Sequence, residues 1–365
     1  MAASYQDHMK TLDDAGVSKT VYALVMPESE AVANAVIADN GTQAREDLLD
    51  MHRAAWTHKQ DATHEEFFST WQGWSSPIVS ADWSAFPHIY PSCGASEALR
   101  EAINAYGTKA FAEGRKPVIH IFEGEYEGFA AYAQAAHIEV KTHRRDRWQE
   151  ALDDIGPGEQ FYLSQPSAID GNVWDDYDAF ARSLNEAQPA AELMLDLTYV
   201  GCVAREFTVK ADYPNIPAVF FSLSKPAGAY YHRIGGCLSR EPYGGLYGNM
   251  WFKNLLSLRI GTEFMRKYGV YDLPRKYRPV QEQAAAIASE KLGRKLGVTL
   301  SAPDVMLLAT AKPTEAPSEL ETLLTRGSGD EAVVRMCVTP TMAYLIDPRL
   351  NKDYKPASEQ GTPSP

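Results

Sequence analysis

The segment Ser222-Leu223-Ser224-Lys225 contains the residues whose types most directly suggest chemistry. It ends a strand-like apolar run, and Arg233 follows eight residues after Lys225. A lysine amine can form a Schiff base with an aldehyde, whereas hydroxyls and a bidentate arginine bind phosphate. The pattern therefore indicates a phosphate held beside a reactive amine, as pyridoxal 5'-phosphate requires. A solvated lysine after a strand is the ordinary alternative for such a short motif.

A second candidate for phosphate binding lies upstream, at Gly94-Ala95-Ser96. These residues open a predicted helix that extends to about residue 107. Backbone N–H groups, a hydroxyl and the helix dipole together suit an anion. Ser96 acting as an ordinary N-cap is the alternative.

Three further side chains could hold a flat, protonated ring. Asp196 ends the apolar run Leu193-Met194-Leu195, so its carboxylate needs a cation or a buried N–H group, unless it caps the following turn. Tyr199 could donate a hydrogen bond to a ring oxygen, and Tyr126 could stack on the ring. Either tyrosine could equally be core packing.

The elements that would position these residues alternate along the chain. Short apolar runs at 118–122, 160–164, 193–197 and 218–222 predict buried strands, and 126–136 and 174–185 predict helices between them. This alternation indicates an α/β fold with a mostly parallel central sheet flanked by helices.

Other predicted elements lie outside this alternation of strands and helices. The sequence predicts helices at 44–56, 250–268 and 280–296, and strands at 305–310 and 333–338. We expect an N-terminal arm on the substrate side at 1–90, a large cofactor-binding domain at 91–296, and a smaller C-terminal α/β domain at 297–349. Residues 350–365 are polar and proline-containing, which predicts a disordered tail.

Composition limits the classes of function. The 365 residues are 45% hydrophobic and carry a net charge of −13 without a basic stripe, so a nucleic-acid or membrane partner is not expected. The four cysteines are far apart, which favours reduced, buried thiols in a cytoplasmic protein. The N-terminus has no apolar segment typical of a secretion signal. Neither a HExxH motif nor a Cys/His cluster is present, so we expect no metal.

The motifs together resemble those of the fold type I pyridoxal-phosphate enzymes, and within them the class I/II aminotransferases, most closely the histidinol-phosphate-aminotransferase-like members. The resemblance covers about residues 90–344 and rests on the order in which the motifs occur. That order is Gly94-Ala95-Ser96, Tyr126, Asp196-Leu197-Thr198-Tyr199, Ser222-Leu223-Ser224-Lys225 and Arg233.

The resemblance implies a role for each residue. Lys225 would form the Schiff base with pyridoxal 5'-phosphate and move the substrate's α-proton, Asp196 would pair with the pyridine nitrogen, and Tyr199 would bond the ring oxygen. The phosphate would be bound by residues from two places in the chain, namely Gly94, Ala95, Ser96, Ser222, Ser224 and Arg233. The resemblance also implies that Arg335 binds the α-carboxylate of an amino-acid substrate, and that the protein is a homodimer with active sites at the subunit interface.

One loop departs from the family pattern. The segment Gln165-Pro166-Ser167-Ala168-Ile169-Asp170-Gly171-Asn172 has Ala168 where the family has an asparagine that contacts the ring oxygen. Ser167 or Asn172 are candidate replacements. No cationic pocket for a second substrate carboxylate stands out in the sequence. Its candidates are three arginines of predicted helix surfaces or loops, Arg240, Arg259 and Arg275.

These observations leave three functions open. The simplest is an aminotransferase of amino-acid metabolism or biosynthesis. The second is elimination, replacement or cyclisation at the side chain of an amino acid, such as S-adenosylmethionine or a basic amino acid, in specialised metabolism; Ala168 keeps it open. The third is a non-catalytic relative that binds a partner, against which the joint presence of Lys225, Asp196, Tyr199 and Arg233 argues.

Overall fold

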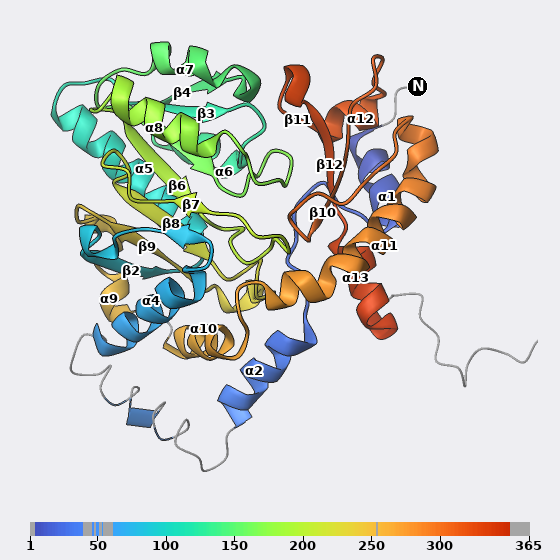
Figure 1. Ribbon diagram of the computed structural model, residues 1–365, viewed down its shortest axis with the longest axis horizontal. Helices are drawn as coiled ribbons and strands as arrows, with labels where there is room; N and C mark the ends of the chain where they lie inside the picture. Colours follow the sequence, from blue (N-terminus) through green and yellow to red (C-terminus); the bar gives the residue numbers. More distant parts are fainter. Residues whose placement is uncertain are drawn as a thin grey trace, which may run out of the picture.

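A seven-stranded sheet forms the larger of two bodies in the computed structural model, which describes residues 4–38, 46, 49–50, 53, 61–252 and 255–350 (Figure 1). All of its strands run parallel except β9. From one edge to the other they are β2 (His88–Ser92), β9 (Gly235–Ser239), β8 (Ala218–Ser222), β6 (Glu192–Asp196), β5 (Gln160–Ser164), β3 (Val118–Phe122) and β4 (Glu139–His143). The predicted mostly parallel α/β sheet is therefore confirmed.

The central strands are buried on both faces because their side chains alternate between two apolar layers. Phe161 and Leu163 of β5 belong to one layer, whereas Tyr162 belongs to the other. The second layer is completed by α5 (Ala95–Ala112) and α6 (Glu127–Ala135), and the first by four helices on the opposite face. These are α4 (Asp61–Ser75), α7 (Trp148–Asp154), α8 (Tyr177–Ala187) and α10 (Leu255–Lys267).

The sequence pattern found the buried strands β3, β5, β6 and β8 nearly to the residue, but it missed β2, β4 and β9. Strand β9 contains two adjacent glycines, and β4 is an edge strand with a polar sequence, so neither has an apolar run. Strands β4 and β9 form because they pair with neighbouring strands, and this pairing leaves no signal in the local sequence.

The smaller body contains a three-stranded antiparallel sheet in the order β10 (Leu308–Ala311), β12 (Val333–Cys337), β11 (Thr325–Arg326). The helix α12 (Glu319–Leu324) packs on β12, while the long helix α11 (Asp272–Leu296) packs on β10. The predicted strand at 305–310 begins later than expected, since Val305 forms only a single bridge with Val203.

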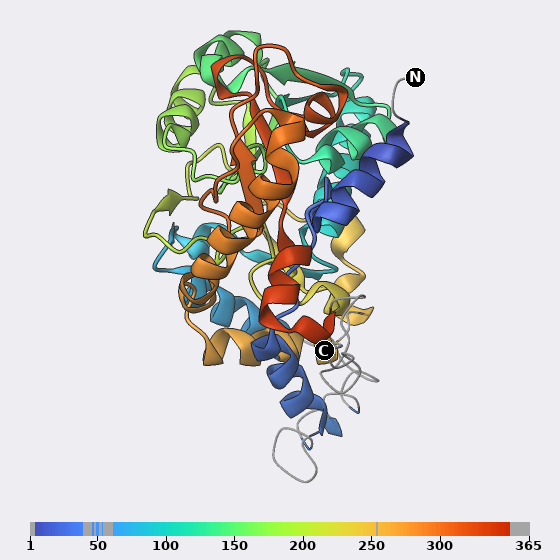
Figure 2. The ribbon, with the colours of Figure 1, turned by 90° about the vertical axis from the view of Figure 1, so that its right-hand side faces the viewer.

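The N-terminal residues divide between the two bodies. Helix α1 (Tyr5–Ala15) lies against α11 and the small sheet, and α13 (Thr339–Ile346) packs on α11 as well (Figure 2). Helix α2 (Pro27–Ala38) packs on α10. Strand β2 begins at His88 and belongs to the large sheet. The domain boundaries after residues 90 and 296 stay predictions.

The remaining described elements are short. Strands β1 (Val79–Ser80) and β7 (Val209–Lys210) pair in parallel, and α9 (Asn249–Phe252) contacts β2. The single helix predicted at 250–268 is therefore interrupted, with α9 and α10 on either side of residues 253–254. The predicted helix at 44–56 lies largely outside the described residues, as does the tail after Leu350.

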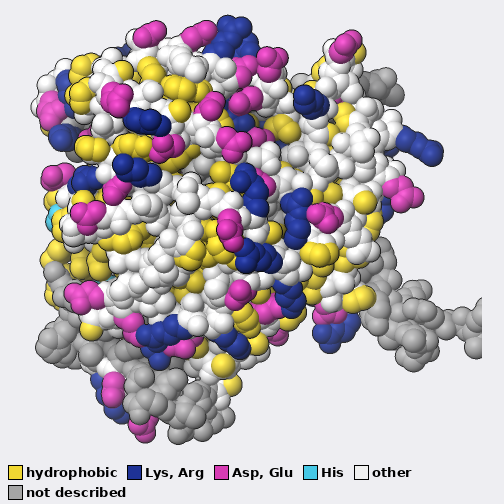
Figure 3. All heavy atoms as spheres, in the orientation of Figure 1, with side chains coloured by type: hydrophobic (Ala, Val, Ile, Leu, Met, Phe, Trp, Pro, Cys, Tyr) yellow, Lys and Arg dark blue, Asp and Glu magenta, His cyan; other side chains and the backbone are white. Residues whose placement is uncertain are grey.

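The surface mixes charges of both signs over the two bodies on the face that Figure 3 shows. Within the described part of the chain, no helix combines the length and apolar character needed to cross a membrane.

Candidate active site

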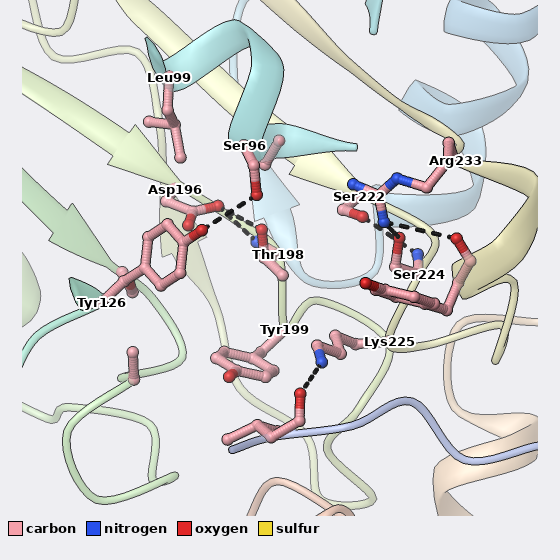
Figure 4. Close-up of a pocket in the computed structure, with 15 residues that line it drawn as sticks. Ser96, Leu99, Tyr126, Asp196, Thr198, Tyr199, Ser222, Ser224, Lys225 and Arg233 are labelled. Carbon is pink, nitrogen blue, oxygen red and sulfur yellow. Dashed lines mark hydrogen bonds between the residues drawn. The ribbon is translucent and has the colours of Figure 1, made fainter. Parts of the chain in front are cut away.

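A cavity of about 260 Å³ lies at the carboxyl edge of the large sheet. Strands β5, β6 and β8 are parallel and end there at Ser164, Asp196 and Ser222, which places these three side chains at one edge. The cavity is lined by Val21, Ala95, Ser96, Leu99, Tyr126, Ser164, Ala168, Asp196, Thr198, Tyr199, Ser222, Ser224, Lys225, Tyr230 and Arg233 (Figure 4). All predicted site residues except Gly94 and Arg335 are among them.

One end of the cavity has the donors that an anion needs. The Nη1 atom of Arg233 lies 3.4 Å from Ser224 Oγ, and Ser222 Oγ accepts a hydrogen bond of 3.1 Å from the Ser224 amide. The N-terminus of α5 begins at Ala95 beside them, and the backbone N–H groups of a first helical turn have no partner within the helix. Hydroxyls, a guanidinium and a helix N-terminus therefore meet at one point, which is the composition of a phosphate site.

Gly94, the N-cap of α5, allows these groups to meet. Its φ is +75°, a conformation that residues with side chains rarely adopt. A Cβ atom at this position would lie 2.9 Å from Arg233 Nη2 and 3.3 Å from Ser222 Oγ. A side chain here would fill the anion-binding end of the cavity.

Lys225 lines the cavity and lies three residues after the end of β8 at Ser222. Its Nζ atom donates a hydrogen bond to the carbonyl oxygen of Val21, which belongs to the segment of residues 18–21 (Figure 4). We call this segment the N-terminal strap; it is tied to the small sheet through two backbone hydrogen bonds between Ser18 and Cys337. Burial lowers the pKa of the Lys225 amine, which makes the neutral, nucleophilic form more accessible.

Asp196 lies across the cavity from Arg233 and is buried, with 5% of its surface exposed (Figure 4). Its Oδ1 atom accepts hydrogen bonds from the amide and the hydroxyl of Thr198, at 2.9 and 2.6 Å. Burial raises the pKa of this carboxyl to about 7. Within the described residues no cation pairs with Asp196. One oxygen thus caps the turn, as the alternative interpretation proposed, and the buried carboxyl still lacks a positive partner.

Tyr199 is buried, and its hydroxyl makes no hydrogen bond to the described part of the chain. Burial raises the pKa of this phenol, so it is a donor at any physiological pH. Ala168 lines the cavity nearby. Neither candidate replacement for the missing asparagine does: Ser167 Oγ accepts from Arg145, and Asn172 Oδ1 accepts from the Asp304 amide. Of the residues considered for contact with a ring oxygen, only Tyr199 lines the cavity.

Tyr126 lies at the side of the cavity near Asp196 (Figure 4). Its hydroxyl is 3.1 Å from Ser96 Oγ and 3.3 Å from the Tyr132 hydroxyl, and its ring packs edge-on against Phe129. These contacts fix the side chain at the cavity wall. Stacking of Tyr126 on a bound ring stays a prediction.

Arg335 lies in an adjoining hollow of about 140 Å³, which we call the arginine hollow. The hollow shares Val21, Tyr126, Ala168, Tyr199 and Lys225 with the main cavity, so the two spaces are adjacent. Arg335 is 7% exposed and donates from Nη1 to the Ala168 carbonyl, while its Nε atom has no hydrogen-bond partner in the described chain. A buried guanidinium with an unused donor suits a carboxylate ligand.

The arginines considered for a second carboxylate lie elsewhere. Arg240 donates to the Ile216 carbonyl, Arg275 donates to the Ala204 carbonyl, and Arg259 lies within ion-pair distance of Glu66 and Glu263. None of the three lines the cavity or the hollow. Two cations that the sequence did not single out, Lys19 and Arg326, line the arginine hollow instead.

Sequence reasoning missed several residues of the site. Thr198 could have been found, since a hydroxyl two residues after an aspartate is typical of a side-chain turn. Glu125 is buried at the hollow, where it accepts hydrogen bonds from the amide and hydroxyl of Ser164 at 3.1 and 2.9 Å. The strap residue Val21 gives no local signal, because it reaches Lys225 only through the fold.

Two other sequence expectations concern cysteine and metal. Cys202, Cys237 and Cys337 are buried free thiols, but Cys93 is exposed because it lies in the turn before α5, so that expectation is wrong for Cys93. Away from the cavity, His120, His143 and Asp154 bring possible metal-ligand atoms within 4.8 Å of one another. His120 Nδ1 lies 2.8 Å from His143 Nε2, so the two rings already share a hydrogen bond.

Comparison with known proteins adds information on the fold. No protein-family model matches the chain, and no curated protein matches it in sequence. Among solved structures, the chain superposes on a probable N-succinyldiaminopimelate aminotransferase from Thermus thermophilus with a TM-score of 0.59 and 17% identity, over 93% of this chain and 97% of that one.

Two further solved structures cover the same range. A putative histidinol-phosphate aminotransferase from Erwinia carotovora gives a TM-score of 0.54 and 13% identity, over 90% and 92% of the two chains. The pyridoxal-phosphate-bound C-S lyase from Staphylococcus hominis gives 0.62 and 10%, over 91% and 90%. Such low identities establish the architecture alone. The chain has the fold type I architecture that these aminotransferases and this lyase share.

Proposed function

We propose that this protein is a pyridoxal-phosphate-dependent enzyme that acts on an amino acid, most simply as an aminotransferase. One observation carries the proposal. A buried carboxyl without a cation (Asp196) and an anion site (Arg233) lie on opposite sides of one cavity, and the amine of Lys225 lines the same cavity (Figure 4). A ring with a protonated nitrogen, an aldehyde and a phosphate meets all three requirements.

The residues present fit this cofactor. Its phosphate would be held by Ser222, Ser224, Arg233 and the first turn of α5, in the space that a Cβ atom at Gly94 would fill. The buried carboxylate of Asp196 would accept a hydrogen bond from the protonated pyridine nitrogen. This contact would supply the cationic partner that the buried carboxyl lacks. Tyr199 would donate its unused hydroxyl hydrogen to the ring oxygen.

When bound, pyridoxal phosphate supplies an aldehyde that condenses with amines and a ring that withdraws electrons from the carbon next to the nitrogen. Asp196 contributes to this chemistry by keeping the ring nitrogen protonated, because an anion beside it stabilises the cationic form. The pKa of Lys225 is lowered by burial, so its neutral amine would be available to accept the α-proton of the substrate at Nζ. Arg335 would orient the substrate by binding its α-carboxylate.

Side-chain elimination, replacement or cyclisation is the second candidate. The observation that favours it is the loop at Ala168, where neither Ser167 nor Asn172 reaches the cavity to replace the missing amide. With Tyr199 as the one nearby donor identified, the ring oxygen would carry more charge than in relatives with two donors. Keto-acid formation from a panel of amino acids, with and without an acceptor, separates the two reactions.

We further propose that the protein is a cytoplasmic homodimer. The free cysteines support the reducing compartment. Tyr230 and Tyr231, next to Arg233, are 49% and 87% exposed, and large exposed aromatic side chains beside a site are typical of a protein interface. Light scattering of the wild type and of Tyr231→Ser tests the dimer: a wild-type monomer would exclude it.

The absorption spectrum of the purified protein, mixed with pyridoxal phosphate, tests the cofactor directly. We expect a visible band that free cofactor lacks and that Lys225→Ala abolishes. A wild type without this band, or a variant that keeps it unchanged, would leave partner binding as the remaining function.

A further inference from the structure

The arginine hollow holds more positive charge than one carboxylate requires. Lys19, Arg326 and Arg335 line it together, in addition to Lys225. Two carboxyl groups line it as well. Glu125 is buried, and burial raises the pKa of its carboxyl, which favours the neutral form. Glu127 also lines the hollow and binds Arg326, so it is a carboxylate that faces the three cations.

Strand register explains why Arg326 and Arg335 belong to the same hollow. In the antiparallel pair of β11 and β12, Arg326 lies opposite Val333. Arg335 is two residues beyond Val333, so its side chain leaves the sheet on the same face. Diagonal neighbours of this kind are about 7–8 Å apart, which is within reach of two ligand groups on one small molecule.

Arg326 already binds a carboxylate in this structure. It donates from Nη2 to Glu127 Oε1 at 2.6 Å, and its side chain is 13% exposed, whereas that of Glu127 is 69% exposed. The partner of this largely buried guanidinium is thus a solvated side chain. Exposed carboxylates are weakly held in such pairs, so a substrate carboxylate that enters the hollow can replace Glu127 on Arg326.

Lys19 supplies the third charge from the N-terminal strap. It is partly buried and makes no hydrogen bond or ion pair to the described part of the chain. With Glu127 paired to Arg326, neither Arg335 nor Lys19 forms an ion pair with a carboxylate of the described residues. An amino acid with only its α-carboxylate neutralises one of them, whereas a substrate with two carboxylates neutralises both.

We propose that Arg326, assisted by Lys19, binds the side-chain carboxylate of the substrate, and that the substrate is therefore an acidic amino acid. This inference rests on the proposed function, because it takes Arg335 as the site of the α-carboxylate. In this proposal, substrate specificity depends on Arg326 of the small body and on Lys19 of the N-terminal strap, rather than on the residues around Lys225.

Calorimetric titration with glutarate and with butyrate tests the proposal, since the two acids differ by one carboxylate. We expect wild-type protein to bind glutarate at least about tenfold more tightly than butyrate. Arg326→Gln reduces this preference about tenfold and leaves butyrate unchanged. Arg182→Gln is the matched control, because Arg182 pairs with Asp178 at a surface away from the hollow. Equal affinities for both acids in the wild type would overturn the proposal.

A second variant guards against a trivial loss through misfolding. Glu127→Gln frees Arg326 from its carboxylate partner, so we expect glutarate to bind more tightly, by several fold, in a protein with one charge fewer. A gain of affinity cannot come from damage to the fold. Weaker glutarate binding in Glu127→Gln would contradict the exchange of partners on Arg326.

The titrations are made before and after addition of pyridoxal phosphate, whose visible band reports its own binding. A band without a preference for glutarate contradicts the acidic substrate and leaves the cofactor proposal intact. A preference for glutarate without a band contradicts the cofactor proposal while supporting Arg326 as a carboxylate site.

Discussion

The amine of Lys225 donates a hydrogen bond to the carbonyl oxygen of Val21, although the two residues are 204 positions apart in the chain. This contact joins the end of β8 to the N-terminal strap. The strap also carries Lys19, and Ser18 ties it to β12, the strand of Arg335. The amine of Lys225 and the arginine hollow are therefore linked by the N-terminal strap, a segment that has no catalytic motif.

The lowered pKa of Lys225 predicts how capture of the cofactor depends on pH. Only the neutral amine attacks an aldehyde. Burial lowers the pKa of Lys225 below the usual lysine value of 10.5, so the neutral amine forms at a lower pH. The rate of band formation after mixing with pyridoxal phosphate should rise with pH and level off below 10.5. Stopped-flow absorbance measures it, with a simple alkylamine as reference. A rate that still climbs in parallel with the reference above pH 10.5 would refute the lowered pKa.

Asp196 predicts a pH-dependent stability of the cofactor-free protein. The folded-state pKa of its carboxyl is raised from 3.8 to about 7, so the folded state binds more protons than the unfolded state between these values. Stability contributed by this group is full below about pH 4 and is lost as pH rises through 7, on the order of 4 kcal/mol in all. Asp196→Asn should therefore have a higher Tm than the wild type at pH 8 and a similar one at pH 4.

Binding of the cofactor should offset the destabilising effect of the Asp196 carboxylate at pH 8. A pyridinium proton beside Asp196 pairs its charge, so the wild type should gain more in Tm from pyridoxal phosphate at pH 8 than Asp196→Asn does. Equal gains in the two proteins would show that Asp196 does not contact the ring.

Gly94→Ala tests the anion site. The added Cβ atom would lie 2.9 Å from Arg233 Nη2 in a backbone conformation with φ of +75°. We expect affinity for pyridoxal phosphate to fall by tenfold or more, with a loss of about 1 kcal/mol in stability from backbone strain. Equilibrium dialysis and thermal unfolding measure the two effects.

Gly114→Ala is its control. Gly114 has a φ of +68°, but nothing lies within 4 Å of its added Cβ atom. The strain is thus comparable while the anion site is untouched, and cofactor affinity should stay at the wild-type value. If both variants lose affinity equally, the loss at Gly94 reflects strain alone.

Tyr199→Phe removes the hydrogen-bond donor that we propose for the ring oxygen. We expect the visible band to shift and turnover to fall about ten- to a hundredfold, because charge on the oxygen loses its hydrogen bond. Retention of the cofactor should change much less, since the phosphate holds it. Tyr213→Phe, whose hydroxyl bonds Asp178 outside the cavity, should leave the spectrum as it is. An unshifted band in Tyr199→Phe would mean that another donor serves the oxygen.

The sequence predicted the central strands and the residues at their carboxyl ends because both signals are local. Apolar runs mark β5, β6 and β8, and the polar residue that ends each run, such as Asp196 or Ser222, lines the cavity at the carboxyl edge of the sheet. Strands β4 and β9 could not be found in this way, since pairing with neighbours rather than composition makes them strands.

Arg326 escaped prediction for a related reason. Arg326 looks like a surface arginine in sequence, and only the register of β11 against β12 places it on the face of Arg335. Likewise, Ser167 and Asn172 are plausible ring-oxygen donors by position, but Arg145 and Asp304 bind them elsewhere. Contacts between distant segments decide these cases, and spacing along the chain does not report them.

Reduction of the protein with borohydride in the presence of pyridoxal phosphate, followed by peptide mass spectrometry, tests the central claim most directly. Reduction fixes the cofactor on the lysine that holds it. The proposal predicts a pyridoxyl group on Lys225 at one per chain, with little label on lysines outside the cavity such as Lys116. Label spread over surface lysines with Lys225 unmodified would contradict it.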